Sequence, residues 1–177
     1  IPNLTVLRPC DPIETFECWE IALNSQNTPC ALILSRQALP ILRKDFKKNK
    51  CYQGAYFLNK SSGYDLTIIA SGSEVSLAME IFEHLKSDGI QSNIVSIPSI
   101  EIFEQQSKLY KEKILGSKPR VVIEASSSFG WHKFLNPIDK VFGIDSFGES
   151  GKAKDVFDHF GFNKIKISNN IKNTYFK

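Results

Sequence analysis

Arg36 is the side chain best suited by type and position to bind a charged ligand. It follows the apolar run Cys30–Leu34, which lacks alternation and is typical of a strand buried on both faces of a parallel sheet. Open α/β sheets place ligand sites at the carboxyl ends of their strands. A planar guanidinium can hold a phosphate or a carboxylate with two N–H donors, which a lysine cannot reproduce. A salt bridge between two domains explains Arg36 equally well.

Arginine is also rare here, because the 22 basic residues include only Arg8, Arg36, Arg43 and Arg120. Two glycine-containing turns invite a phosphate-loop interpretation, but both lack essential residues. Ser71–Glu74 has a single glycine, and a capping box from Ser71 to Glu74 explains its composition. In Gly148–Ala153 the residue after the lysine has no hydroxyl for Mg²⁺. We therefore expect a helix cap and an ordinary loop.

The histidines, cysteines and Glu124 give no catalytic or metal-binding set. His84 and His159 are expected on solvated helix faces, and His132 lacks a partner at catalytic spacing. Glu124, at the end of a buried strand, is either a general base or, as we favour, a carboxylate bound to the next helix N-terminus. The absence of CxxC spacing argues against a disulfide scaffold or a zinc site, and reduced thiols of a cytoplasmic protein are expected at Cys10, Cys18, Cys30 and Cys51.

The composition is that of a soluble globular protein that binds neither membranes nor nucleic acid. The 177 residues, 42% hydrophobic and 23% charged, suit one medium domain or one domain with a remnant of its neighbour. No apolar run approaches membrane-spanning length, and the start at Ile1 has neither an initiator Met nor signal-peptide features, which suggests a fragment. The net charge is only +3, and the lysine-rich stretch Arg43–Lys50 predicts a solvated linker.

Before that linker the sequence predicts one helix and one strand. Asp11 and Pro12 are typical of an N-cap and first helical position. Phe16, Trp19 and Leu23 follow at helical spacing and predict a buried stripe.

After the linker, strands and helices alternate. Strands are expected at 54–58, 66–70, 93–97, 120–124 and 141–145, and helices at 74–88, 100–110 and 152–160. A last strand is expected at 164–167, followed by a polar tail. This alternation predicts an α/β fold of three layers, with a largely parallel sheet covered by helices on both faces.

Several short segments resemble, in order and spacing, the carboxy-terminal part of transketolases. The segments are Ile1–Asp11, Ala31–Gln37 with its Ser-Arg-Gln ending, Ile69–Val75, Val95–Ser99, Glu124–Ser126, Phe147–Ser150 and Phe160–Phe162. The resemblance implies a division into the end of a pyrimidine-binding domain (1–42), a linker (43–51) and the transketolase C-terminal domain (52–177). It also implies a five-stranded mixed sheet whose first strand is antiparallel to the rest.

The resemblance implies a function as well. Transketolases transfer a two-carbon ketol unit between sugar phosphates in the pentose phosphate pathway, as homodimers that hold thiamine diphosphate with a divalent metal, Mg or Ca. The residue that matches Arg36 holds the substrate phosphate in that family. The Gly-Asp-Gly and Thr-His-Gln-Pro motifs are absent. We therefore expect no catalytic, cofactor or metal residue here, and no bound cofactor or activity in the fragment alone.

Two alternatives remain open from the sequence. The same terminal domain occurs in deoxyxylulose phosphate synthases and in the β-chains of 2-oxoacid dehydrogenases, although the Ser-Arg-Gln ending favours transketolase. The other alternative is a stand-alone, non-catalytic interaction module, against which the elements of residues 1–42 argue because they look like half of another domain.

Overall fold

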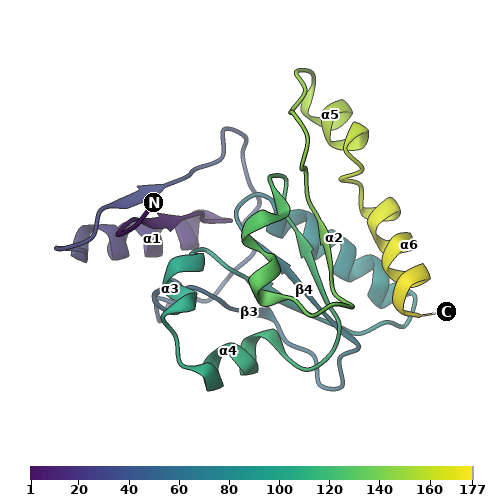
Figure 1. Cartoon of the computed structure of the whole chain (residues 1–177), viewed down its shortest axis with the longest axis horizontal. Helices are drawn as coiled ribbons and strands as arrows, with labels where there is room; N and C mark the ends of the chain where they lie inside the picture. Colours follow the sequence, from purple (N-terminus) through teal and green to yellow (C-terminus); the bar gives the residue numbers. More distant parts are fainter. Residues whose placement is uncertain (177) are drawn as a thin grey trace.

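The chain forms a small sheet followed by a larger one. The computed structural model describes residues 1–176. Strands β1 (Thr5–Leu7) and β2 (Cys30–Leu32) run parallel and are connected by helix α1 (Pro12–Asn24). In Figure 1 this unit projects to one side of the larger, five-stranded sheet.

The larger sheet has the strand order β3-β5-β4-β6-β7. Strands β4 to β7 are parallel, and β3 lies at the edge, antiparallel to β5. This confirms the predicted mostly parallel α/β sheet and its antiparallel first strand. The strands span Tyr56–Asn59 (β3), Leu66–Ala70 (β4), Ser92–Ser96 (β5), Arg120–Ile123 (β6) and Lys140–Phe142 (β7).

Alternate residues of the central strands pack into two separate hydrophobic cores, one on each face of the sheet. Ile68 packs in the core that contains α2 (Glu74–Ser87) and α6 (Lys164–Tyr175). Its neighbour Ile69 packs in the core that contains α3 (Ile100–Glu104) and α4 (Lys108–Leu115). Helices therefore cover both faces, as predicted for three layers (Figure 1).

The remaining elements are short. They are the 3₁₀ turns η1 (Cys51–Gln53), η2 (Ser128–Gly130) and η3 (His132–Phe134), and helix α5 (Ala153–His159). The single helix predicted for 100–110 is in fact the pair α3 and α4, because Ser107 caps a second helix by accepting from the Tyr110 N–H. Among residues 1–176, no helix is long and apolar enough to cross a membrane.

The strand predicted at 164–167 is wrong, because these residues begin α6. The side chain of Asn163 caps the helix by accepting from the N–H groups of Ile165 and Lys166. Ile167 and Ile171, four residues apart, are buried in the core that contains α2, whereas Ile165 is 52% exposed. The alternating sequence of 164–167 looked like a strand because four residues are too few to separate the two periodicities.

The buried stripe predicted for α1 is also wrong within the described residues. Phe16 and Leu23 are 72% and 78% exposed, and Trp19 is 49% exposed. The helix instead buries its other face, which carries Glu14, Glu17, Cys18 and Ile21. Helical spacing identified an apolar face, but it could not tell which side of α1 the rest of this chain covers.

Truncation of isoleucines on α6 tests its helical structure. Ile171→Ala should lower the free energy of unfolding by about 2–5 kcal/mol, because it opens a cavity in a packed core. Ile165→Ala should change it by less than about 0.5 kcal/mol, as expected for an exposed position. Urea denaturation of the chain measures both. An equal loss for Ile165→Ala and Ile167→Ala would contradict the helix, because these two side chains share a face only in a strand.

Candidate functional site

Arg36 lies in the loop that leaves the carboxyl end of β2. The strand ends at Leu32, two residues earlier than predicted, so Arg36 stands four residues beyond it. The Arg36 side chain is exposed. Within residues 1–176 its guanidinium forms no ion pair with a carboxylate. The salt bridge between the two parts of the chain is made by Arg8 with Glu124, and Arg43 pairs with Glu17 of α1.

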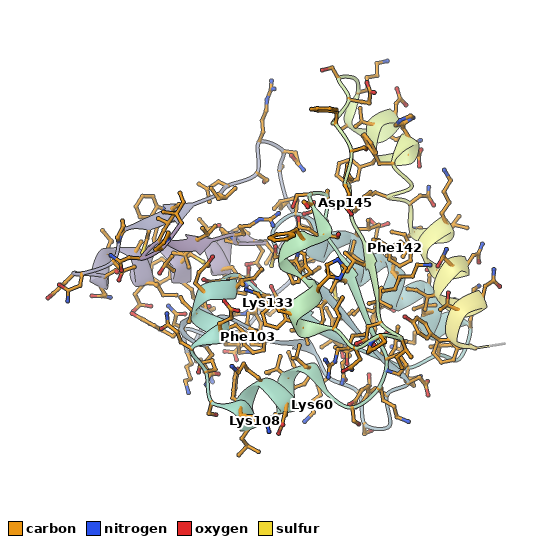
Figure 2. All side chains as sticks on the ribbon, in the orientation of Figure 1. Lys60, Phe103, Lys108, Lys133, Phe142 and Asp145 are labelled. Atoms are coloured by element: carbon orange, nitrogen blue, oxygen red, sulfur yellow. The ribbon has the colours of Figure 1, made fainter. Side chains whose placement is uncertain are left out.

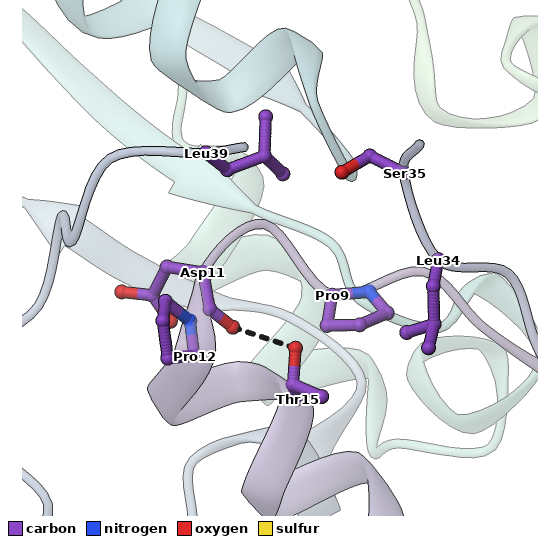
Figure 3. Close-up of a pocket in the computed structure, with 7 residues that line it drawn as sticks. All are labelled: Pro9, Asp11, Pro12, Thr15, Leu34, Ser35 and Leu39. Atoms are coloured by element: carbon purple, nitrogen blue, oxygen red, sulfur yellow. Dashed lines mark hydrogen bonds between the residues drawn. The ribbon is translucent and has the colours of Figure 1, made fainter. Parts of the chain in front are cut away.

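The residue before Arg36 lines a cavity of about 360 Å³ between this loop and the start of α1. Figure 3 shows Ser35 and Leu39 on the loop facing the first turn of the helix. On the helix side of the cavity, the Thr15 hydroxyl donates to the Asp11 carbonyl oxygen at 2.9 Å within the first turn of α1. The lining residues are Pro9, Asp11, Pro12, Thr15, Leu34, Ser35 and Leu39.

Asp11 connects the start of α1 to the far end of the loop. As predicted, it is the N-cap, since Oδ1 accepts from the Glu14 N–H at 2.8 Å. Its second oxygen, Oδ2, accepts from the N–H groups of Leu42 and Arg43 at 3.1 and 3.0 Å. Asp11 is only 2% exposed. The sequence indicated the cap but not the contact with residues 42 and 43.

The prediction of a solvated linker is wrong for Arg43, which is 4% exposed. Its guanidinium donates to both carboxylate oxygens of Glu17, at 2.8 and 2.6 Å, and lies 5.0 Å from the centroid of the Tyr56 ring. The N–H groups of Lys50 and Cys51 also donate to Glu17. A charge run reveals nothing about a partner 26 residues earlier, so composition alone misassigned this residue.

The environment of Glu17 lowers the pKa of its carboxyl. Burial by itself would raise that pKa, but the hydrogen bonds from Arg43 and Cys51 and the charge of Arg43 favour the carboxylate and outweigh burial. The pair therefore stabilises the ionised form of Glu17.

A second buried cluster joins β1 to the larger sheet. Arg8 donates to both oxygens of Glu124, at 2.6 and 2.9 Å, and its Nη2 lies 3.5 Å from Glu74. The Ser71 hydroxyl donates to Glu124 at 3.3 Å. Glu124 is 0% exposed and bound to Arg8, so within the described residues it is neither a free base nor a helix-terminus ligand.

The same cluster corrects the predicted capping box. The N-cap of α2 is Ser73, not Ser71, and its hydroxyl donates to Glu74 at 2.6 Å. Burial and the nearby charge of Glu124 raise the pKa of Glu74, against the effects of Ser73 and Arg8. Glu74 thus belongs to an interdomain ion cluster, which a local helix-start pattern does not reveal.

Another buried carboxylate, Glu14, links α1 to β3 and β5. It accepts from the Tyr56 hydroxyl at 2.6 Å, the Ser96 hydroxyl at 2.7 Å and the Cys10 N–H at 2.7 Å. Burial raises its pKa even though these donors favour the ionised form. Glu14, which lies in the first turn of α1, was not singled out from the sequence.

The other residues considered from the sequence do not gather around Arg36. His132 Nε2 lies 3.3 Å from the Ser128 hydroxyl, which donates to Asp145 at 2.7 Å in an exposed cluster on the larger domain. Figure 2 labels Asp145 of this cluster. His84 is half-buried and His159 is exposed. All four cysteines are free thiols. In the described part of the chain, no three His, Cys, Asp or Glu side chains are grouped to hold a metal ion.

The contribution of the Glu17–Arg43 pair to the free energy of unfolding should depend on pH. Glu17→Gln should cost about 3 kcal/mol at pH 7, because it leaves the buried Arg43 without its counter-charge. The folded-state pKa of Glu17 is lowered, so this contribution is present above the unfolded pKa and is lost as the pH falls through the folded pKa. Urea denaturation at pH 7 and at pH 3 should show a smaller difference from wild type at the lower pH.

The matched control is Glu20→Gln, one turn further along α1 at an exposed position. It should change stability by well under 1 kcal/mol at either pH. An effect of Glu17→Gln that is small at pH 7, or that grows on acidification, would contradict the assigned role of the pair.

Comparisons with known proteins match both parts of the chain to domains of one family. Residues 54–163 match the family described as Transketolase-like TK C-terminal domain, and residues 1–41 match Transketolase, pyrimidine binding domain. A transketolase of Sinorhizobium medicae is 47% identical over 163 residues, which are 90% of this chain and 24% of that protein.

Two solved transketolases have the same fold. The enzyme from Campylobacter jejuni superposes with a TM-score of 0.88 at 42% identity, over 97% of this chain and 26% of that one. The Pichia stipitis enzyme, solved in complex with sedoheptulose 7-phosphate, superposes with a TM-score of 0.90 at 36% identity, over 98% and 25%. This chain thus spans about a quarter of each relative. It belongs to the transketolase family, in which it corresponds to the end of the pyrimidine-binding domain and the C-terminal domain.

Proposed function

We propose that the complete protein carrying these residues is a transketolase, which transfers a two-carbon ketol unit between sugar phosphates in the pentose phosphate pathway. The observation that carries the proposal is the match of both parts of the chain, in order, to the two consecutive transketolase domains. The sedoheptulose 7-phosphate in the Pichia stipitis complex supports sugar phosphates as the substrate class. A ketol-transfer assay, run beside a pyruvate-dependent assay, separates this activity from that of other thiamine enzymes.

Within this proposal, Arg36 binds the phosphate of the sugar. Three features support the role: its position beyond the carboxyl end of β2, its exposure, and the adjacent cavity lined by Ser35. A guanidinium with its N–H donors directed to solvent can form a bidentate contact with a phosphate. By contrast, Arg8 and Arg43 already have both of their terminal nitrogens engaged by carboxylates of this chain.

The implied thiamine diphosphate and its divalent metal, Mg or Ca, do not fit the residues described here. Glu17 and Glu124 are held by arginines, and Glu14 is held by two hydroxyls and an N–H group. No metal-binding group of acidic, histidine or cysteine side chains occurs among residues 1–176. We therefore propose that other parts of the complete enzyme hold the cofactor.

The proposal includes a homodimer and the division of the chain into residues 1–42, 43–51 and 52–177. The matched ranges 1–41 and 54–163 support the division. The exposed face of α1 that carries Phe16, Trp19 and Leu23 supports a further packing partner, since an apolar face of this kind is seldom left in solvent. The remainder of a pyrimidine-binding domain, or the neighbouring subunit, would supply that partner.

Substitution of Arg36 tests the phosphate role. In the complete enzyme, Arg36→Gln should raise KM for a phosphorylated ketose roughly 10- to 100-fold, which is the loss expected for a charged hydrogen-bond pair of about 1.5–3 kcal/mol. Steady-state kinetics with sedoheptulose 7-phosphate, with sedoheptulose, and with a phosphate-free acceptor measure the effect. KM for sedoheptulose should not change.

Lys48→Gln, an exposed basic position in the segment that follows this loop, is the control and should leave both KM values unchanged. Arg36→Lys should recover only part of the loss, because an ammonium group cannot form the bidentate contact. An Arg36→Gln enzyme with wild-type KM for the phosphorylated sugar would refute the assignment.

The isolated chain should be inactive. We expect no ketol transfer from the purified 177-residue polypeptide supplied with thiamine diphosphate and Mg²⁺, because the Gly-Asp-Gly motif is absent from this sequence and the described residues include no group of acidic, histidine or cysteine side chains that could hold the metal. A coupled assay for the sugar phosphate product measures turnover. Activity above the enzyme-free background that persists through purification would contradict this proposal.

A further inference from the structure

The loop that carries Arg36 is fastened at both ends to the same short segment. At its start, the Ile33 N–H donates to the Leu7 carbonyl oxygen at 2.8 Å. At its end, the N–H groups of Leu42 and Arg43 donate to Asp11 Oδ2 at 3.1 and 3.0 Å. Residues 7–11 lead from β1 into α1, so both ends of the loop contact one short stretch of chain, the start through the Leu7 carbonyl oxygen and the end through the Asp11 side chain.

Between these two ends the loop has little hydrogen bonding of its own. In the described part of the chain, the Ser35 hydroxyl donates to the Gln37 carbonyl oxygen at 2.8 Å, which is a contact within the loop. Residues 34–38 are exposed. The direction in which Arg36 points therefore depends on where the two ends are held. The start is held by a strand-like backbone contact. At the end, Asp11 Oδ2 holds the backbone of residues 42 and 43, and Glu17 holds the Arg43 guanidinium.

Asp11 is well suited to hold the end of the loop. Its two oxygens accept from three backbone N–H groups, and it is almost completely buried. Within residues 1–176 it forms no salt bridge with a basic side chain. Its negative charge is thus stabilised by N–H donors at the start of α1 and at the end of the loop, and it ties the two together.

We propose that Asp11 is a positioning residue for substrate phosphate: by holding residues 42 and 43 against the start of α1, it orients Arg36 beside the cavity that Ser35 and Thr15 line. This inference rests on the proposed function, in which Arg36 binds the phosphate of the sugar. If the end of the loop is released, the loop must be ordered when substrate binds, so affinity for the phosphorylated substrate falls while the chemical step is unaffected.

Asp11→Asn separates the two tasks of this side chain. Asparagine is about as good an N-cap as aspartate, so α1 keeps its cap. An amide, however, has only one oxygen. If that oxygen accepts from Glu14, the NH₂ group faces the N–H groups of Leu42 and Arg43 and cannot accept from either. Asp11→Ser, which caps well and has no second oxygen, is the companion variant if the asparagine variant folds poorly.

The experiment measures steady-state kinetics of the complete enzyme with sedoheptulose 7-phosphate, with sedoheptulose, and with a phosphate-free acceptor. Asp11→Asn should raise KM for the phosphorylated donor about 5- to 30-fold, which is less than Arg36→Gln does, with kcat within about twofold. KM for sedoheptulose should be that of the wild type. Ser107→Ala, which removes the N-cap of α4, controls for a general loss of stability and should leave both KM values unchanged.

A double-mutant cycle distinguishes positioning from a separate structural effect. Once Arg36 has been replaced by glutamine, adding Asp11→Asn should raise KM for the phosphorylated donor no further. A multiplicative increase, or a fall in kcat that is equal for both donors, would overturn the proposal. If KM for the phosphorylated donor rises in Arg36→Gln but not in Asp11→Asn, the positioning role alone is refuted. Unchanged kinetics in Arg36→Gln would instead refute the phosphate site itself.

Limited proteolysis gives a readout that does not depend on activity. Trypsin cleaves after Arg36, and this peptide bond lies in the exposed loop. Release of the loop end in Asp11→Asn should speed cleavage at Arg36–Gln37 several-fold, because proteolysis requires local opening of the chain. Ser107→Ala should not alter it. An unchanged cleavage rate in Asp11→Asn would mean that the loop is held by other contacts, and would overturn the proposal.

Discussion

A carboxylate can be buried only where donors replace the water that it loses, and among residues 1–176 the carboxylates of Asp11, Glu14, Glu17, Glu74 and Glu124 are buried. Glu17 is paired with Arg43, Glu124 with Arg8, and Glu14 with the hydroxyls of Tyr56 and Ser96. The Glu124 and Glu14 contacts join the first 14 residues to the larger domain, and the Glu17 contact joins α1 to Arg43 in the segment that leads into that domain. The relative placement of the two parts is therefore set by directional, charge-assisted hydrogen bonds as well as by apolar packing.

This arrangement has a consequence for residues 33–43, the loop that carries Arg36. The loop begins at the small sheet, and its far end is held twice, by Asp11 at the backbone of residues 42 and 43 and by Glu17 at the Arg43 guanidinium. Arg36 lies between these anchors, and its side chain is exposed. A site that must bind a phosphate benefits from such a loop, because ordering the backbone in advance lowers the entropic cost of binding.

Much of the larger domain could be predicted from the sequence. Runs such as Leu66–Ala70, followed by helices with apolar residues three and four apart, predicted a mostly parallel sheet covered on both faces, and the structure confirms it. The strand expected at 164–167 failed because its period was assigned from four residues, while the twelve-residue helix buries Ile167 and Ile171. The prediction that Arg43 is solvated failed because the lysine-rich composition around it is typical of an exposed linker. The rarity of arginine in the chain was a signal that could have been used.

The sequence by itself determined the local elements and the type of fold, because periodicity, caps and turns depend on neighbours a few residues apart. It also identified Arg36 as a side chain able to bind phosphate. Only the tertiary structure decided which arginines are paired with carboxylates and which one is left exposed. Arg8 reaches Glu124 across 116 positions and Arg43 reaches Glu17 across 26, while Arg36 pairs with no carboxylate of residues 1–176. Such pairings depend on the folded path of the chain, since contacts between distant residues form only when separate elements pack together.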